Sequence, residues 1–188
     1  MESNAQHFET ATDALKGDHR IIEKVLGFLE KATSGSVDAP FEAWSKAVDF
    51  IRNFADRCHH LREEKLLFPL LESKGIPVEG GPIGMMLIEH DEGRGYVRGM
   101  AEALERAKAE PQAAKTVLIE NAGAYLRMLR QHILKEDEVL FMMAEDALSE
   151  EEQKTLLREF EEHEERELGT GVHEKYLKIA EELEALAG

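Results

Sequence analysis

The sequence has little that suits an extracellular, nucleic-acid-binding or membrane protein. Its one cysteine, Cys58, cannot form an internal disulfide, which favours a reducing environment. Lys and Arg number 23 against 39 Asp and Glu, and this net charge of −16 argues against attraction to nucleic acids or anionic membranes. No apolar run approaches the roughly 20 residues that cross a bilayer, and residues 1–13 lack the features of a signal peptide. We therefore expect a cytoplasmic protein with no nucleic-acid partner and no membrane partner.

Patterns typical of β-strands are also missing, whereas helical patterns are frequent. Only 6% of the residues are aromatic and five are proline, while Ala, Leu, Glu and Lys are abundant. No run alternates apolar and polar residues long enough for a sheet, but Leu15, Ile22, Leu26 and Leu29 recur at helical spacing. The predicted fold class is all-α, with helices over about residues 10–32, 40–73, 83–109, 111–147, 149–167 and 172–186.

The helix lengths and connections predict the architecture. Ser149 with Glu152 forms the pattern of a capping box that opens the fifth helix, and Pro69 is expected to kink or end the second. Four long helices with short connections predict an up-down-up-down four-helix bundle over residues 10–147. We expect the two shorter helices, within residues 148–188, to pack on the bundle as a C-terminal extension.

Each of the four long predicted helices carries a histidine near its middle. Because mid-helix positions of an antiparallel bundle meet at a similar depth, these four imidazoles are expected to converge. Two of them, His59 and His132, are followed four residues later by Glu63 and Glu136. Side chains four residues apart lie on one face of a helix, so each pair offers an imidazole and a carboxylate to one point.

The second helix also offers His60 and Glu64 at the same spacing. An internal repeat distinguishes the two alternatives, because residues 59–68 align without a gap on residues 132–141. The alignment selects the pair that begins at His59. His60 and Glu64 are then expected at the surface or behind the ligands, with the alternative that a shifted helix exchanges them with their neighbours His59 and Glu63.

Burying two carboxylates and four imidazoles is costly unless a cation neutralises them. Six ligands are too many for one tetrahedral zinc ion, but they suit two iron ions bridged by both carboxylates, with Mn or Zn as alternatives. An oxo or hydroxo bridge would make each iron five-coordinate and leave a position for a small ligand such as O₂, NO or peroxide. The predicted metal ligands are His19, His59, Glu63, His90, His132 and Glu136.

Four sequence segments resemble the hemerythrin-like, or HHE cation-binding, family. They are LKGDHR up to Arg20, HHLREEKLLFP from His59, EHD around His90 and HILKEDEVLF from His132. The resemblance covers about residues 10–147. It implies a four-helix bundle around a non-haem di-iron centre, with the six residues above as ligands and both glutamates as bridges.

One position departs from the oxygen-carrying members of that family. They have a second histidine one turn after the third-helix ligand, where this sequence has Arg94. One iron would then lack its fifth imidazole, which argues against reversible oxygen carriage. The six-ligand pattern is closer to that of iron-centre repair proteins and of bacterial family members linked to nitric oxide, peroxide or iron handling.

Further residues are candidates for supporting roles. Glu89 and Asp137 are interpreted as groups that orient ligand imidazoles through the free ring N–H. The acidic tail repeats the His-x-x-x-Glu spacing, and although a solvated helix is the favoured interpretation, a supplementary ligand from the tail stays open. The tail residues concerned are His163, Glu164, Glu167 and His173.

Three functions follow from this pattern. The leading hypothesis is a di-iron protein that binds a small oxidant or gas in sensing, detoxification or iron homeostasis. The first alternative is a di-iron oxidoreductase that acts on nitric oxide or peroxide. The second is a metal-storage or interaction module without turnover.

Overall fold

The computed structural model describes residues 8–167, 169 and 171–188, and all the regular elements in these ranges are helices. The all-α fold class is therefore confirmed. Four helical rods come first, of which the second and fourth contain π-helical segments, labelled η. The rods are α1 (Ala11–Thr33); α2 (Phe41–Phe50), η1 (Ile51–His60), η2 (Glu63–Leu67) and α3 (Phe68–Ser73); α4 (Pro82–Arg106); and α5 (Pro111–Lys135), η3 (Glu136–Leu140) and α6 (Phe141–Ala147).

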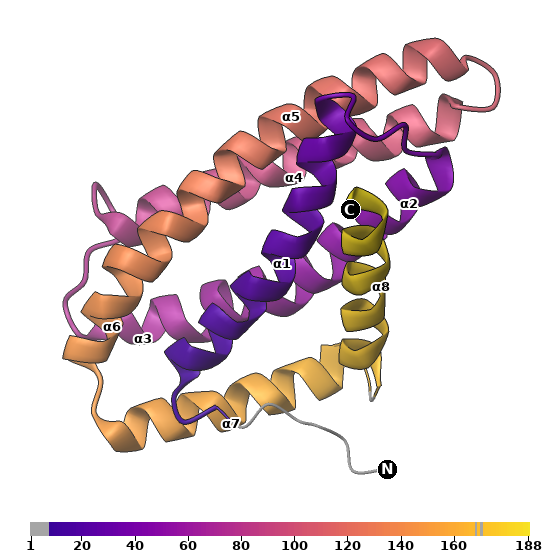
Figure 1. The fold of residues 1–188 in the computed structure, drawn as a ribbon. Helices are drawn as coiled ribbons and strands as arrows, with labels where there is room; N and C mark the ends of the chain where they lie inside the picture. Colours follow the sequence, from indigo (N-terminus) through magenta and orange to yellow (C-terminus); the bar gives the residue numbers. More distant parts are fainter. Residues whose placement is uncertain (1–7, 168, 170) are drawn as a thin grey trace.

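The four rods form the expected antiparallel bundle, and two more helices follow it (Figure 1). α4 and α5 lie side by side, and α1 packs on α5. α7 (Glu150–Glu167) passes the end of the bundle at which α3 and α6 lie, and α8 (Val172–Ala187) returns beside α1 and α2. Within the described ranges, no helix is both long and apolar enough to span a membrane.

Two of the predicted local signals can be compared directly with the structure. The capping box at the start of α7 is confirmed, because the Ser149 backbone N–H donates to Glu152 Oε2 at 2.9 Å. Pro69 does not end the second rod. It lies in the first turn of α3, directly after the π-helical segment η2.

A polar layer divides the core of the bundle into two hydrophobic clusters. One cluster holds Phe28, Trp44 and Phe54 and is extended by residues of α8, and the other holds Phe141 and is extended by Phe160 of α7. Between them lie buried polar side chains from all four rods: Asp18, His19, His59, His60, Arg62, Glu63, His90, His132 and Glu136. The hydrophobic clusters thus hold a set of ionisable groups away from water.

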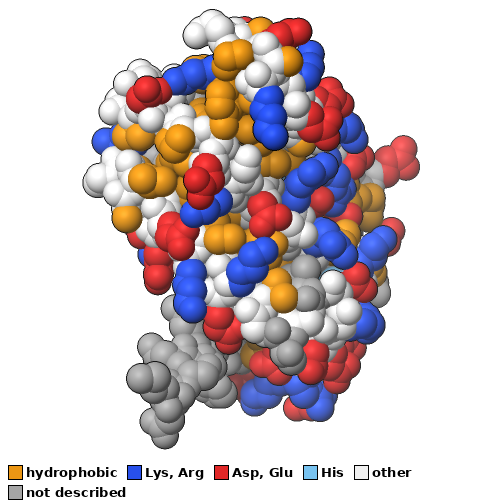
Figure 2. Space-filling view, turned by 90° about the vertical axis from the view of Figure 1, so that its right-hand side faces the viewer, with side chains coloured by type: hydrophobic (Ala, Val, Ile, Leu, Met, Phe, Trp, Pro, Cys, Tyr) orange, Lys and Arg blue, Asp and Glu red, His pale blue; other side chains and the backbone are white. Residues whose placement is uncertain are grey.

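The side of the molecule shown in Figure 2 carries Lys and Arg side chains interspersed with Asp and Glu. Ion pairs tie α8 to its neighbours, including Lys24–Glu184 and Lys46–Glu182, both at 2.9 Å. Such exposed pairs contribute little to stability. The docking of α8 therefore depends mainly on the burial of its apolar face.

Candidate metal centre

The polar layer contains all six of the predicted metal ligands. His19 comes from α1, His90 from α4 and His132 from α5, whereas the remaining three come from the ends of π-helical segments. Each of the six is at most 1% exposed. The six predicted residues are His19, His59, Glu63, His90, His132 and Glu136.

The imidazoles form two pairs that face each other through their Nε2 atoms. His19 Nε2 lies 3.0 Å from His59 Nε2, and His90 Nε2 lies 3.2 Å from His132 Nε2. The internal repeat thus has a structural counterpart, since each pair joins one lone histidine to one histidine of a His-x-x-x-Glu motif.

Each of the two glutamates contacts both imidazole pairs. Glu136 Oε2 lies 3.3 Å from His19 Nε2 and 3.2 Å from His132 Nε2. Glu63 reaches the other members, with Oε1 at 3.7 Å from His59 Nε2 and Oε2 at 3.5 Å from His90 Nε2. Both carboxylates therefore lie where they could bridge two cations.

His60 also belongs to the cluster, contrary to the expectation that it lies at the surface or behind the ligands. It is 5% exposed, and its ring stacks on that of His90 with centroids 4.0 Å apart. One potential ligand atom from each of His60, Glu63, His90 and His132 lies within 4.8 Å of the others. A fifth imidazole, from η1, therefore lies within reach of the cluster, although Arg94 occupies the position one turn after His90.

The π-helical backbone explains why the α-helical spacing missed His60. In an α-helix each N–H donates to the carbonyl four residues earlier, whereas in η1 and η2 it donates to the carbonyl five residues earlier. Examples are the bonds from the Leu61 N–H to the Asp56 carbonyl and from the Phe68 N–H to the Glu63 carbonyl. A π-turn holds more residues than an α-turn, so successive side chains diverge less. His59 and His60 can then both face the interior.

Every Nδ1 atom of the four paired imidazoles contacts a carboxylate. Glu89 and Asp137 do so as predicted, at 3.0 Å from His132 and 2.7 Å from His19. The other two carboxylates are Asp18, at 3.1 Å from His59, and Glu64, at 2.8 Å from His90. This contact fixes the ring orientation and leaves Nε2 directed at the cluster.

A cation in turn contacts each of these outer carboxylates. Arg62 contacts Asp18, Arg20 contacts Asp137, Lys135 contacts Glu89, and Arg94 contacts Glu64. The alignment of residues 59–68 on 132–141 pairs Glu64 with Asp137 and Arg62 with Lys135. Because Asp137 was predicted to orient a ligand imidazole, the repeat could have predicted the same role for Glu64.

The inner carboxylates show that this donor set fits a cation. All four side-chain oxygens of Glu63 and Glu136 are buried and make no hydrogen bond. Burial and the charge of Glu136 raise the pKa of Glu63 well above its usual range. Burial opposes ionisation of Glu136 as well, but His132 and His19 hold its pKa well below the usual range. Imidazole and carboxylate ligands without thiolate suit iron, manganese or zinc.

The imidazoles differ in their protonation when no metal is bound. Burial lowers the pKa of His59 to about 4, so its ring is neutral at physiological pH. Burial also favours the neutral form of His132, but Glu136 and Glu89 outweigh it and raise the pKa of His132 to about 9. A metal ion would have to displace the proton that His132 carries.

The tail residues contribute no atom to the cluster among the described side chains. Glu164 instead accepts a hydrogen bond from Cys58 at 3.5 Å and lies 3.1 Å from His173 Nδ1. It also lies 3.7 Å from Arg62, which connects the tail to Asp18 and so to the cluster. His163 is buried and Glu167 is exposed, and neither reaches the ligands.

Comparison with known proteins agrees with this geometry. The Hemerythrin HHE cation binding domain matches residues 10–144. Uncharacterized proteins of Mycobacterium tuberculosis and Mycobacterium bovis are each 27% identical over 163 residues, which covers 85% of this chain and 63% of theirs. The iron-sulfur cluster repair protein YtfE of Salmonella schwarzengrund is 31% identical over 88 residues, which covers 46% of this chain and 40% of that protein. This chain therefore spans less than two thirds of the length of the curated relatives it matches. It belongs to the hemerythrin HHE cation-binding family.

Proposed function

We propose that the protein holds two iron ions in the polar layer and uses them to bind a small ligand: O₂, NO or peroxide. The observation that carries this proposal is the pair of buried, unbonded carboxylates, each in contact with both imidazole pairs. Two bridged cations would satisfy all four carboxylate oxygens at once. The proposed ligands are the six predicted residues together with His60.

The two halves of the site offer unequal numbers of donors. One half has His19 and His59, and the other has His60, His90 and His132, while Glu63 and Glu136 serve both. The half with two imidazoles keeps more of its coordination positions open, and an open position is what a small ligand requires. We place ligand binding in that half.

The chain's own residues hold and tune the centre, while the irons, when bound, supply the open coordination and the redox chemistry. The four outer carboxylates keep the Nε2 lone pairs directed inward, and the hydrophobic clusters exclude water. We propose that residues 10–147 form this cation-binding unit and that residues 148–188 form an extension packed on it. Sensing, detoxification and iron homeostasis are all compatible roles.

Metal analysis and visible spectroscopy of the purified protein test the proposal. We expect about two irons per chain, and a charge-transfer band when the anaerobically reduced protein meets O₂, NO or peroxide. His59→Ala and Glu136→Ala should abolish most iron binding, whereas Glu161→Ala, on the exposed side of α7, should not. Unchanged iron content in the first two variants would contradict the proposed centre.

The likeness to the repair protein YtfE favours a second candidate, in which the protein donates iron during the repair of iron-sulfur clusters. Its single cysteine is buried, so the chain has no exposed thiol among its described residues on which to hold such a cluster itself. Transfer of iron from the loaded protein to a cluster-free acceptor would support this role. Steady consumption of nitric oxide or peroxide would instead identify an oxidoreductase, and stoichiometric metal with neither response would identify a storage module.

A further inference from the structure

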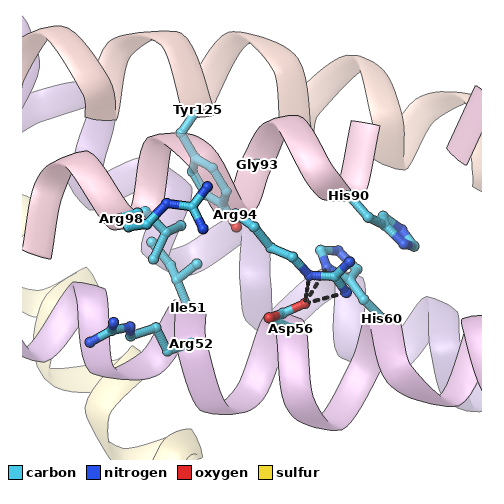
Figure 3. Close-up of a pocket in the computed structure, with 10 residues that line it drawn as sticks. Ile51, Arg52, Asp56, His60, His90, Gly93, Arg94, Arg98 and Tyr125 are labelled. Carbon is cyan, nitrogen blue, oxygen red and sulfur yellow. Dashed lines mark hydrogen bonds and ion pairs between the residues drawn. The ribbon is translucent and has the colours of Figure 1, made fainter. Parts of the chain in front are cut away.

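A pocket of about 230 Å³ opens beside the candidate metal centre, between η1, α4 and α5 (Figure 3). His60 and His90 form its inner wall, and Ile51 and Val97 line it with apolar surface. The pocket is much larger than a diatomic molecule requires. It borders the half of the centre that has three imidazoles, so it is separate from the half in which we place the small ligand.

Positive charge predominates around this pocket. Three arginines line it against one carboxylate, Asp56, although the whole chain carries a formal charge of −16. Arg94 is already engaged, since it donates to Asp56 at 2.9 Å and to Glu64 at 2.7 Å. Arg52 and Arg98 form no ion pair or side-chain hydrogen bond with any described residue. Two guanidinium groups are therefore free for an anionic ligand.

The pocket also contains an unused hydrogen-bond donor. Tyr125 is 1% exposed, and its buried hydroxyl has no hydrogen-bond partner in the described structure. Burial raises the pKa of Tyr125, so the group remains a neutral phenol that can donate. The ring packs beside Gly93 of α4, where a Cβ would lie 3.4 Å from Tyr125 Cε2. In the view of Figure 3 the Tyr125 ring and the Arg98 guanidinium overlap, and both residues line the pocket.

These features together select a class of ligand. A carboxylate accepts hydrogen bonds from a guanidinium in a planar, two-point geometry and can accept another from a phenol. The apolar residues Ile51 and Val97 suit a short hydrocarbon chain better than they suit a phosphate or a sulfate. We propose that this pocket binds a short-chain monocarboxylate, with its carboxylate at Arg98 and the Tyr125 hydroxyl and with Arg52 at the opposite wall.

The site would bind its ligand whether or not metal is present, because none of its polar donors is a proposed metal ligand. The test is a titration of the metal-free and the metal-loaded full-length protein with acetate, propionate and butyrate at constant ionic strength, followed by NMR. We expect saturable binding to both forms. Arg98→Gln and the nearly isosteric Tyr125→Phe should each weaken binding about tenfold or more.

Two controls separate the outcomes. Arg130 lies elsewhere on α5 and pairs with Glu30 of α1, so Arg130→Gln should leave the affinity for the carboxylate unchanged. His59→Ala should lose iron but still bind the carboxylate, so failure of the metal proposal is distinguishable from failure of this one. The inference is overturned if the wild-type protein shows no saturable binding, if Tyr125→Phe and Arg98→Gln bind as well as the wild type, or if nitrate and phosphate bind equally well.

Discussion

Single side chains determine which metal chemistry this bundle can support. Five imidazoles and two carboxylates meet in one buried layer, and four of the imidazoles have a carboxylate on their outer nitrogen. His60 differs from the others because its Nδ1 is 3.6 Å from Asp56, too far for a hydrogen bond. Its orientation therefore depends on stacking with His90 rather than on an outer carboxylate.

This difference gives a prediction for His60. Because the ring is buried at the half of the site with three imidazoles, His60→Ala should lower the iron content and change the visible spectrum. The effect should be smaller than that of His59→Ala, because four other donors remain in that half. Iron analysis and absorption spectroscopy of the two variants provide the comparison. Wild-type iron content and an unchanged spectrum in His60→Ala would exclude it as a ligand.

The protonation of His132 makes metal binding depend on pH. Its pKa is raised to about 9, so below that pH a metal ion must displace a proton from the ring. Affinity should therefore increase from about pH 6 to about pH 8, by about tenfold per pH unit for each proton displaced. Calorimetry in buffers of different ionisation enthalpy would measure the proton release directly. Affinity that falls as the pH rises over this range would contradict the assignment.

At the scale of helices, most of the architecture could be predicted from sequence, because apolar spacing and turn residues are local signals. The helix ends agree with the expected ones to within a few residues, and the repeat located the two His-x-x-x-Glu motifs. The π-helical segments could not be predicted, since they are rare and the apolar spacing was interpreted with the α-helical period. His60 was therefore missed, although it stands beside a predicted ligand in the chain.

Helix α7 provides a test of how firmly the tail is attached. Phe160 is fully buried in the hydrophobic cluster that contains Phe141, and Arg62 lies 5.3 Å from the centre of its ring. Phe160→Ala should lower the free energy of unfolding by about 3–5 kcal/mol, as for other buried aromatic residues. Urea denaturation would measure it, with Glu161→Ala as the control on the same helix. A loss no larger than that of the control would show that α7 is only loosely docked.

Considered as a whole, the molecule buries two carboxylates whose oxygens make no hydrogen bond and which a metal ion would satisfy, so its stability should depend on metal. Ligands that bind only the folded state stabilise it by about 2.7 kcal/mol at a free concentration of about 100 times Kd. Removing metal with a chelator should therefore lower Tm, and adding iron or zinc should restore it. Glu63→Ala together with Glu136→Ala should make Tm independent of metal. If the wild-type Tm does not respond to metal, these buried groups are satisfied in another way.

The ligands that the site binds could be predicted from the sequence less completely than the fold. Residue types and spacing identify a family and a set of donors, but the pocket at Tyr125 depends on three segments that are distant along the chain. The spacing of Arg52, Arg94 and Arg98 along the chain does not predict that they line one cavity. Only the packing of α4 against η1 and α5 places them around one cavity.

The tail covers the two halves of the repeat unequally. The Arg62–Asp18 pair lies beneath α7, with both side chains at most 6% exposed, whereas its counterpart Lys135–Glu89 has a lysine that is 39% exposed. In D₂O, the proton shared by His132 and Glu89 should consequently exchange for deuterium faster than the proton shared by His59 and Asp18. One outer carboxylate–imidazole pair of the layer would therefore exchange its proton with bulk water much more slowly than its counterpart in the repeat.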